Sequence, residues 1–139
     1  VAQRDDMAML AIRYTRKAEG VSYQRSVSLS NETNEVLRMN NFIEKVCKDL
    51  HVKKSVADEI GQTMEEAMVN LLKYGFAEGV KGNIHIEVSA DEKMLKFVMR
   101  DNGQPIDAAN RLSQPAAVDA VSYEVGADQN VLTLCSSRR

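Results

Sequence analysis

Apolar residues recur at helical spacing in two consecutive stretches of the chain. In the first stretch they are Leu37, Phe42, Ile43, Val46 and Leu50. These intervals predict an amphipathic helix, and the preceding letters "SNETNE" supply residues that cap helices. After the connector "HVKKS", a second and longer helix is predicted to end near residue 74, with Ser55 as its candidate N-cap.

Strand patterns surround the two predicted helices. Residues 7–14, "MAMLAIRY", are mostly apolar, as expected of a buried strand, whereas polar and apolar residues alternate over 21–29, 84–88 and 95–99. The letters "VSYEVGADQNVLTL" predict a hairpin that turns at 126–129. Together these patterns indicate an α+β fold, a two-layer α/β sandwich with helices packed on one face of a mixed, mostly antiparallel sheet.

Composition narrows the class of protein. The 139 residues suffice for one domain with a core, and 44% hydrophobic with 27% charged residues is a normal globular mixture. The net charge of −2 gives no electrostatic footprint for nucleic acid or an anionic membrane, so we expect neither as a partner. No signal peptide or membrane-spanning apolar run is visible, and Cys47 and Cys135 lack metal-ligand spacing. We therefore expect reduced thiols in a cytoplasmic protein.

The second predicted helix carries unusual polar residues within "EEAMVNLLKYGF". Glu66 and Asn70 are four residues apart, so their side chains lie on one helix face and can reach one ligand. Glutamate offers a proton acceptor, and asparagine offers a neutral oxygen that suits a hard cation such as Mg²⁺. Taken alone, the helix favours a simpler explanation, a polar stripe that meets water.

A second polar cluster, "RDNGQPID", follows the predicted strand over 95–99. Asp101, at the strand terminus, can accept a hydrogen bond from an amino group, and Gly103 lets a flat ligand approach without a Cβ in the way. A type I or II turn, for which Asn-Gly and Pro suffice, explains the same letters without any ligand.

Together the two clusters resemble a known family. The order Glu-x-x-x-Asn on a helix, two strands, and then Asp-x-Gly-x-Pro-x-Asp is similar to the histidine-kinase-like (GHKL) ATPases of the Bergerat fold. Within that family it resembles the anti-sigma-factor serine kinases of bacterial partner-switching systems. The matching residues are Glu66, Ala67, Asn70, Tyr74, Phe76, Asp101, Gly103, Pro105 and Asp107. The likeness covers about residues 26 to 134, including a last helix turn and the closing hairpin.

The resemblance implies a role for each polar residue of the two clusters. Asn70 would coordinate a Mg²⁺ that bridges the phosphates of ATP, and Glu66 would act as general base, or orient the acceptor serine hydroxyl. Asp101 would accept the adenine amino hydrogen, and Gly103 would flank the base.

Two further side chains complete the implied ATP site. A polar residue of the last strand would support the contact between Asp101 and adenine; Thr133 is our first candidate, and Asn130 stays open as the alternative. Lys73 lies near the Asn70 side of its helix, where it could approach a phosphate or simply be solvated.

The activity that the resemblance implies is an ATP- and Mg²⁺-dependent protein serine/threonine kinase. Such a kinase binds a sigma factor and phosphorylates a serine of an anti-sigma-factor antagonist. These kinases are often dimers, so the resemblance leaves the choice between a monomer and a homodimer open. A competing class is a domain of the same fold that binds partners without ATP turnover. A third is another GHKL activity such as histidine kinase output, against which the chain shows no helix pair with a phosphoacceptor histidine.

The family pattern then fails after Asp107, where a flexible lid and a glycine-rich box that opens a helix are expected. Here "AANRLSQPAA" joins Asp107 almost directly to "VDAVSY", and no glycine lies between Gly103 and Gly126. The lid and box are therefore missing between residues 108 and 117. Either residues of a mobile lid are omitted from this sequence, which we favour, or the deletion is real and the phosphate grip is gone.

The first residues carry a second resemblance. "QRDDMAMLAIRY" is similar to the final strand of sporulation-type metal-dependent serine/threonine phosphatases, in which the residue matching Asp5 helps to bind a catalytic Mn²⁺ or Mg²⁺. We therefore expect a fragment of a phosphatase–kinase fusion: a phosphatase strand remnant over 1–16, a linker over 17–25, and the ATPase domain over 26–139. A simple strand with a solvated acidic start explains the same letters.

Overall fold

The computed structural model describes residues 22–138, so the predicted strand over 7–14 and Asp5 lie outside the described residues. In chain order the elements are β2 (Tyr23–Ser30), α1 (Glu35–Asp49), α2 (Lys54–Tyr74), β3 (Asn83–Ala90), β4 (Met94–Asp101), the 3₁₀ helix η1 (Ala108–Arg111), β5 (Ala120–Val125) and β6 (Asn130–Ser137). Residues 23–25, which we expected in a linker, therefore belong to β2.

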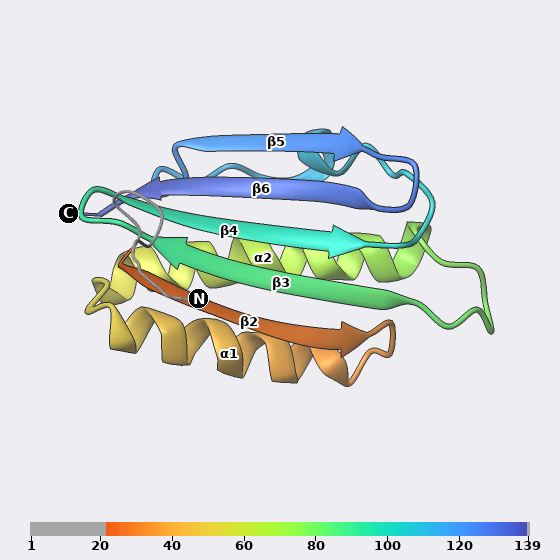
Figure 1. Cartoon of the computed structure of the whole chain (residues 1–139), viewed down its shortest axis with the longest axis horizontal. Helices are drawn as coiled ribbons and strands as arrows, with labels where there is room; N and C mark the ends of the chain where they lie inside the picture. Colours follow the sequence, from red (N-terminus) through yellow and green to blue (C-terminus); the bar gives the residue numbers. More distant parts are fainter. Residues whose placement is uncertain (1–21, 139) are drawn as a thin grey trace, which may run out of the picture.

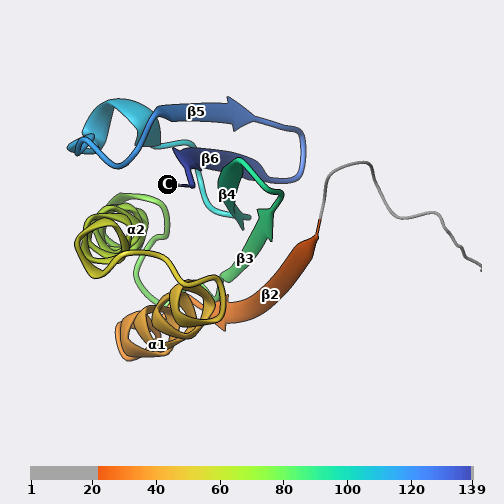
Figure 2. The same ribbon diagram turned by 90° about the vertical axis from the view of Figure 1, so that its left-hand side faces the viewer.

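One sheet joins the five described strands in the order β2-β3-β4-β6-β5 (Figure 1). All four pairings between these strands are antiparallel. Both helices pack on the same face of the sheet, and no described helix covers the other face (Figure 2). The predicted two-layer α+β sandwich is thus confirmed, with a sheet that is antiparallel throughout the described strands.

The core lies between this sheet and the two helices. Alternate residues of the central strands point toward the helices and are buried, as the period of two predicts: Ile84, Ile86 and Val88 of β3, Leu95, Phe97 and Met99 of β4, and Leu132 and Leu134 of β6. The buried face of α2 includes Ile60, Met64, Met68 and Leu71. Because these apolar residues fix how α2 is rotated on the sheet, Glu66 and Asn70 are turned out of the core and are only half-buried.

Two expectations about the helices are wrong, one about where α2 begins and one about which residues α1 buries. Ser55 is not the N-cap of α2; the helix begins at Lys54, and the Lys53 carbonyl accepts the first helical hydrogen bond from the Ala57 N–H at 2.8 Å. Lys53 takes an extended conformation and makes no side-chain cap, so the backbone alone starts the helix. Leu37 does not face the core but is 66% exposed, because it lies about 200° around the helix from the fully buried Met39.

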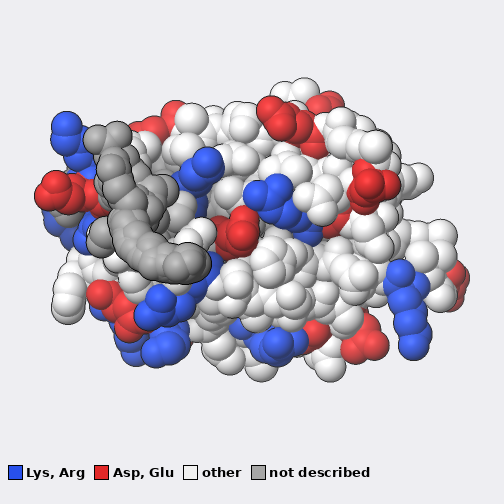
Figure 3. Space-filling model, viewed as in Figure 1, with Lys and Arg blue, Asp and Glu red and all other residues white. Residues whose placement is uncertain are grey.

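The described surface agrees with the near-neutral composition. On the open face of the sheet, basic and acidic side chains are interspersed and form no single patch of one sign (Figure 3). Over residues 22–138 no helix combines the length and the apolar character that crossing a membrane requires. Cys47 and Cys135 are both free, and burial raises the pKa of the Cys47 thiol to about 11, which keeps it protonated at neutral pH.

Candidate functional site

Asp101, the last residue of β4, is a buried carboxylate held by two donors. Only 6% of the residue is exposed, and burial raises its pKa above the usual aspartate value. Its Oδ1 accepts hydrogen bonds from the Gly103 N–H at 2.9 Å and from Asn130 Nδ2 at 3.0 Å, which partly oppose that rise in pKa. Within residues 22–138 its Oδ2 has no hydrogen-bond partner, so this oxygen can still accept an amino hydrogen.

Gly103 packs directly against the end of α2. A Cβ at this position would lie 2.5 Å from the carbonyl oxygen of Gly75, which is closer than real Cβ atoms come to other atoms. The next residue, Gln104, donates its backbone N–H to the same carbonyl at 2.8 Å and its Nε2 to the Tyr74 carbonyl at 2.6 Å. The glycine thus has a packing reason within the fold, and its place beside adenine stays a prediction.

Asn130, and not Thr133, supports Asp101. Residues of β6 alternate between the two faces of the sheet, so Asn130 shares the helix-covered face with Leu132 while Thr133 points to the opposite face. Asn130 is 2% exposed, and its Nδ2 donates both to Asp101 and to the Gly103 carbonyl at 2.8 Å. Our assignment of Thr133 to this contact is therefore corrected to Asn130.

This correction makes a prediction about stability. Asn130→Ala removes both donations from a buried amide and should lower the free energy of unfolding by about 1–3 kcal/mol. Thr133→Ala, the matched change three residues further along the same strand, should cost less than about 1 kcal/mol. Urea unfolding of both variants measures the difference. A larger loss in Thr133→Ala than in Asn130→Ala would reverse the assignment.

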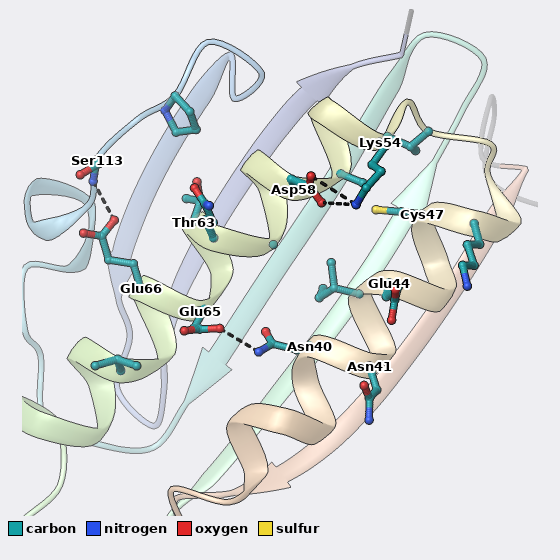
Figure 4. Close-up of a pocket in the computed structure, with 18 residues that line it drawn as sticks. Asn40, Asn41, Glu44, Cys47, Lys54, Asp58, Thr63, Glu65, Glu66 and Ser113 are labelled. Atoms are coloured by element: carbon teal, nitrogen blue, oxygen red, sulfur yellow. Dashed lines mark hydrogen bonds and ion pairs between the residues drawn. The ribbon is translucent and has the colours of Figure 1, made fainter.

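Glu66 and Asn70 lie together on α2, and both bind the backbone of the connection between β4 and β5. Oε1 of Glu66 accepts the Ser113 N–H at 2.9 Å (Figure 4), and Nδ2 of Asn70 donates to the Arg111 carbonyl at 3.2 Å. The structure therefore brings the two predicted side chains to one face of the helix. Lys73, on the same face, is exposed and forms no hydrogen bond or ion pair with any residue from 22 to 138; its approach to a phosphate stays a prediction.

Arg111 links this polar face to the end of α2 beside Asp101. Its guanidinium lies 4.5 Å from the ring centroid of Tyr74, and its Nε donates to the Ile106 carbonyl at 2.6 Å. The connection thus runs from Asp101 past Tyr74 to Asn70 and Glu66. Asn70 and Glu66 thus bond to a segment of chain that begins directly after Asp101.

The connection itself holds only one short helical element. After Asp107, which has a positive φ of 55°, η1 forms four residues of 3₁₀ helix, and no further helix lies between η1 and β5. The last helix turn that the resemblance implied at the start of "DAVSYEVGADQNVLTL" is not formed, because residue 119 lies outside any helix and β5 begins at Ala120. Phosphates bind well at a helix N-terminus, and no helix N-terminus faces Glu66 and Asn70, so the part of the site beside these two residues does not fit the phosphates of ATP in the described conformation. The part beside Asp101 does fit the adenine amino group, because one carboxylate oxygen is free to accept it.

A groove of about 920 Å³ lies between α1, α2 and the connection. Glu66 and Ser113 line it, as do Asn40 and Glu65, whose side chains are bonded across it at 2.8 Å (Figure 4). Asn70 and Asp101 do not line it. Within residues 22–138 no group of three or more His, Cys, Asp or Glu side chains could hold a metal ion.

Glu59 is a member of the polar face that we did not predict. Its Oε1 accepts the Ala117 N–H at 2.9 Å. The sequence could have indicated it, because Glu59 precedes Glu66 by seven residues and so lies within about 20° of it around the helix. Its partner, a backbone group far along the chain, left no trace in the sequence.

The fold and the two polar clusters around Glu66 and Asp101 define a class of protein. The family described as "Histidine kinase-like ATPase domain" matches residues 29–135, and the chain belongs to this family. Membership implies an ATP-binding domain.

One solved structure has a similar fold. The chain is similar to the structure titled "The crystal structure of the RsbU and RsbW domains of Rv1364c from Mycobacterium tuberculosis", with a TM-score of 0.67 and 19% sequence identity. The likeness covers 84% of this chain and 33% of that chain, so this chain spans about a third of the protein it matches. At this identity the match establishes the fold. No curated protein matches the sequence.

Proposed function

We propose that this chain is the ATP-binding domain of a protein serine/threonine kinase of the anti-sigma-factor type. One observation carries the proposal: a buried aspartate with one free carboxylate oxygen lies beside the end of the helix that presents Glu66 and Asn70 on one face. The family match and the fold likeness to a chain that holds an RsbW domain support it.

In this proposal each side chain has a stated task. Asp101, held by Asn130, accepts the adenine amino hydrogen, and Gly103 lies beside the base. Asn70 would hold a Mg²⁺ through its amide oxygen, and Lys73 would neutralise phosphate charge. ATP, when bound, would supply its γ-phosphoryl group and leave as ADP. Glu66 orients the acceptor serine and takes its hydroxyl proton, for which it must release the Ser113 N–H.

The partners follow from the same proposal. They are a sigma factor, which the domain sequesters in the cytoplasm, and an anti-sigma-factor antagonist, whose serine accepts the phosphoryl group; the domain acts as a monomer or a homodimer. The chain matches about a third of a protein with RsbU and RsbW domains, which supports a fragment of a phosphatase–kinase fusion. Asp5 would then bind metal only within a complete phosphatase domain.

A second candidate is a domain that binds partners without ATP turnover. One feature favours it: the connection occupies Glu66 and Asn70, and only a four-residue 3₁₀ helix lies where the family holds its phosphate-binding helix.

Titration calorimetry with ATP, in the presence and absence of Mg²⁺, separates the two candidates. The kinase is expected to bind ATP with micromolar affinity that depends on Mg²⁺, and to transfer labelled phosphate to a serine of the antagonist. No binding of ATP by the intact natural protein would contradict the kinase and leave the partner-binding domain.

A further inference from the structure

We propose that the connection between β4 and β5 is an intramolecular competitor for the phosphate end of the nucleotide site, held on α2 by Glu59. Residues 111–117 occupy the side chains that the proposed kinase needs, so the described conformation is self-inhibited. This inference rests on the proposed function, because it concerns the same ATP site.

The hydrogen bonds between the connection and α2 follow one continuous line. Arg111 binds Asn70, Ser113 binds Glu66, and Ala117 binds Glu59, so the connection runs antiparallel to the helix. The connection uses only main-chain groups in all three bonds, two N–H donors and one carbonyl acceptor. The polar face of α2 therefore acts as a binding site for an extended peptide, and the chain itself supplies that peptide.

Further contacts hold the two ends of this peptide. At one end the Arg111 guanidinium stacks on Tyr74 and bonds to the Ile106 carbonyl. At the other, Nε2 of Gln114 donates to the Val118 carbonyl at 2.9 Å, which tightens the turn before β5. A short tethered segment loses little entropy when it binds, so it competes well with a ligand in solution.

Competition follows because the connection occupies the space beside Glu66 and Asn70. The backbone of Ser113 lies against the Glu66 carboxylate (Figure 4), and the Arg111 carbonyl lies within hydrogen-bond distance of the Asn70 amide, so a phosphate group that approached these two side chains would meet this backbone. The apparent Kd for ATP is then the intrinsic value divided by the fraction of molecules whose connection has been released. Any change that releases the connection must raise the affinity for ATP.

Glu59 offers a way to test this without touching the nucleotide residues. It lies two helical turns from Glu66, and its one described side-chain hydrogen bond goes to Ala117. Glu65→Ala is the matched control, since that carboxylate lies on the same helix but binds Asn40 Nδ2 instead of the connection. Both variants exchange one glutamate for alanine and leave Asp101, Asn70 and Glu66 unchanged.

Calorimetric titration with Mg²⁺–ATP of the 139-residue chain and both variants is the experiment. Glu59→Ala is expected to lower the apparent Kd about fivefold to tenfold, the value of a net hydrogen bond of ordinary strength, and Glu65→Ala to change it less than about twofold. Ser113→Pro, which removes the donor to Glu66 by an independent route, should act in the same direction. Thermal unfolding checks that each variant folds.

Limited trypsin digestion gives a second readout. Linkage requires that ATP release the connection if the connection excludes ATP, so saturating Mg²⁺–ATP should speed cleavage after Arg111 in the wild-type chain. ATP binding by folded Glu59→Ala with an unchanged Kd and no ATP-dependent cleavage would overturn the inference and leave the proposed function intact. No ATP binding by any variant would overturn both.

Discussion

Asp101→Asn is expected to weaken ATP binding about a hundredfold. In the proposed site the free Oδ2 accepts the adenine amino hydrogen, whereas an asparagine turned to keep Oδ1 as acceptor would present an NH₂ donor at that position. Two donors then face each other in a buried site, which costs the hydrogen bond and leaves polar groups unsatisfied. Titration calorimetry with Mg²⁺–ATP measures the loss.

The stability of the same variant shows whether a weaker affinity comes from the site or from the fold. Asparagine still offers Oδ1 to Gly103 and Asn130, so Asp101→Asn should fold as well as the wild type. If this variant is fully folded and binds ATP as tightly as the wild type, Asp101 does not bind the adenine. Adenosine, which lacks phosphates, should lose affinity to the same degree, because the substitution acts only at the base.

The pH dependence of unfolding provides a second test at Asp101. Burial raises its pKa, so the folded protein holds this proton up to a higher pH than the unfolded chain does. The contribution to stability is then complete below the unfolded pKa of about 3.9 and is lost as the pH rises through the raised folded pKa. Asparagine does not titrate, so Asp101→Asn has no such loss. As the pH rises from the unfolded to the folded pKa of Asp101, the free energy of unfolding should therefore fall in the wild type relative to the variant. Urea unfolding at several pH values measures this difference.

The architecture could be predicted because the hydrophobic period differs between the two kinds of element. Ile84, Ile86 and Val88 alternate with polar residues, so both the strand and its buried face follow from the letters. Leu37 shows where this reasoning fails: a single apolar residue in the first helical turn is compatible with a helix but does not have to lie on its buried face. Ser55 fails for another reason, since a backbone carbonyl at Lys53 starts α2 without any side chain.

The candidate site could be predicted only where its geometry is local. Glu66 and Asn70 share a face because they are one helical turn apart on the same helix. The choice between Asn130 and Thr133 depended on the register of β6, which pairs Asn130 with Asp101 and Thr133 with Val98, and the chain letters do not fix that register. The place of the connection on α2 depends on backbone groups, which carry no signature in the sequence.

If the proposed kinase uses Glu66 as its general base, Glu66→Gln should reduce phosphoryl transfer to the proposed antagonist about 10²–10⁴-fold, the usual contribution of such a base. Glutamine can still accept the Ser113 N–H, so the connection and the fold should be preserved, but a neutral amide cannot take the proton of the serine hydroxyl. Single-turnover transfer of labelled phosphate from ATP to the purified antagonist measures the rate.

The affinity for ATP separates a chemical role of Glu66 from a binding role. If Glu66 acts on the serine proton, the Kd of Glu66→Gln for Mg²⁺–ATP stays within about twofold of the wild-type value while transfer falls. Glu65→Gln is the matched control, because this neighbouring carboxylate bonds to Asn40 across the groove and should leave transfer unchanged. Equal transfer rates in Glu66→Gln and the wild type would remove Glu66 from the chemistry. A parallel loss of ATP binding and transfer would instead make Glu66 a nucleotide ligand. Only a selective loss of transfer fits a carboxylate that must leave a backbone N–H in order to reach a substrate.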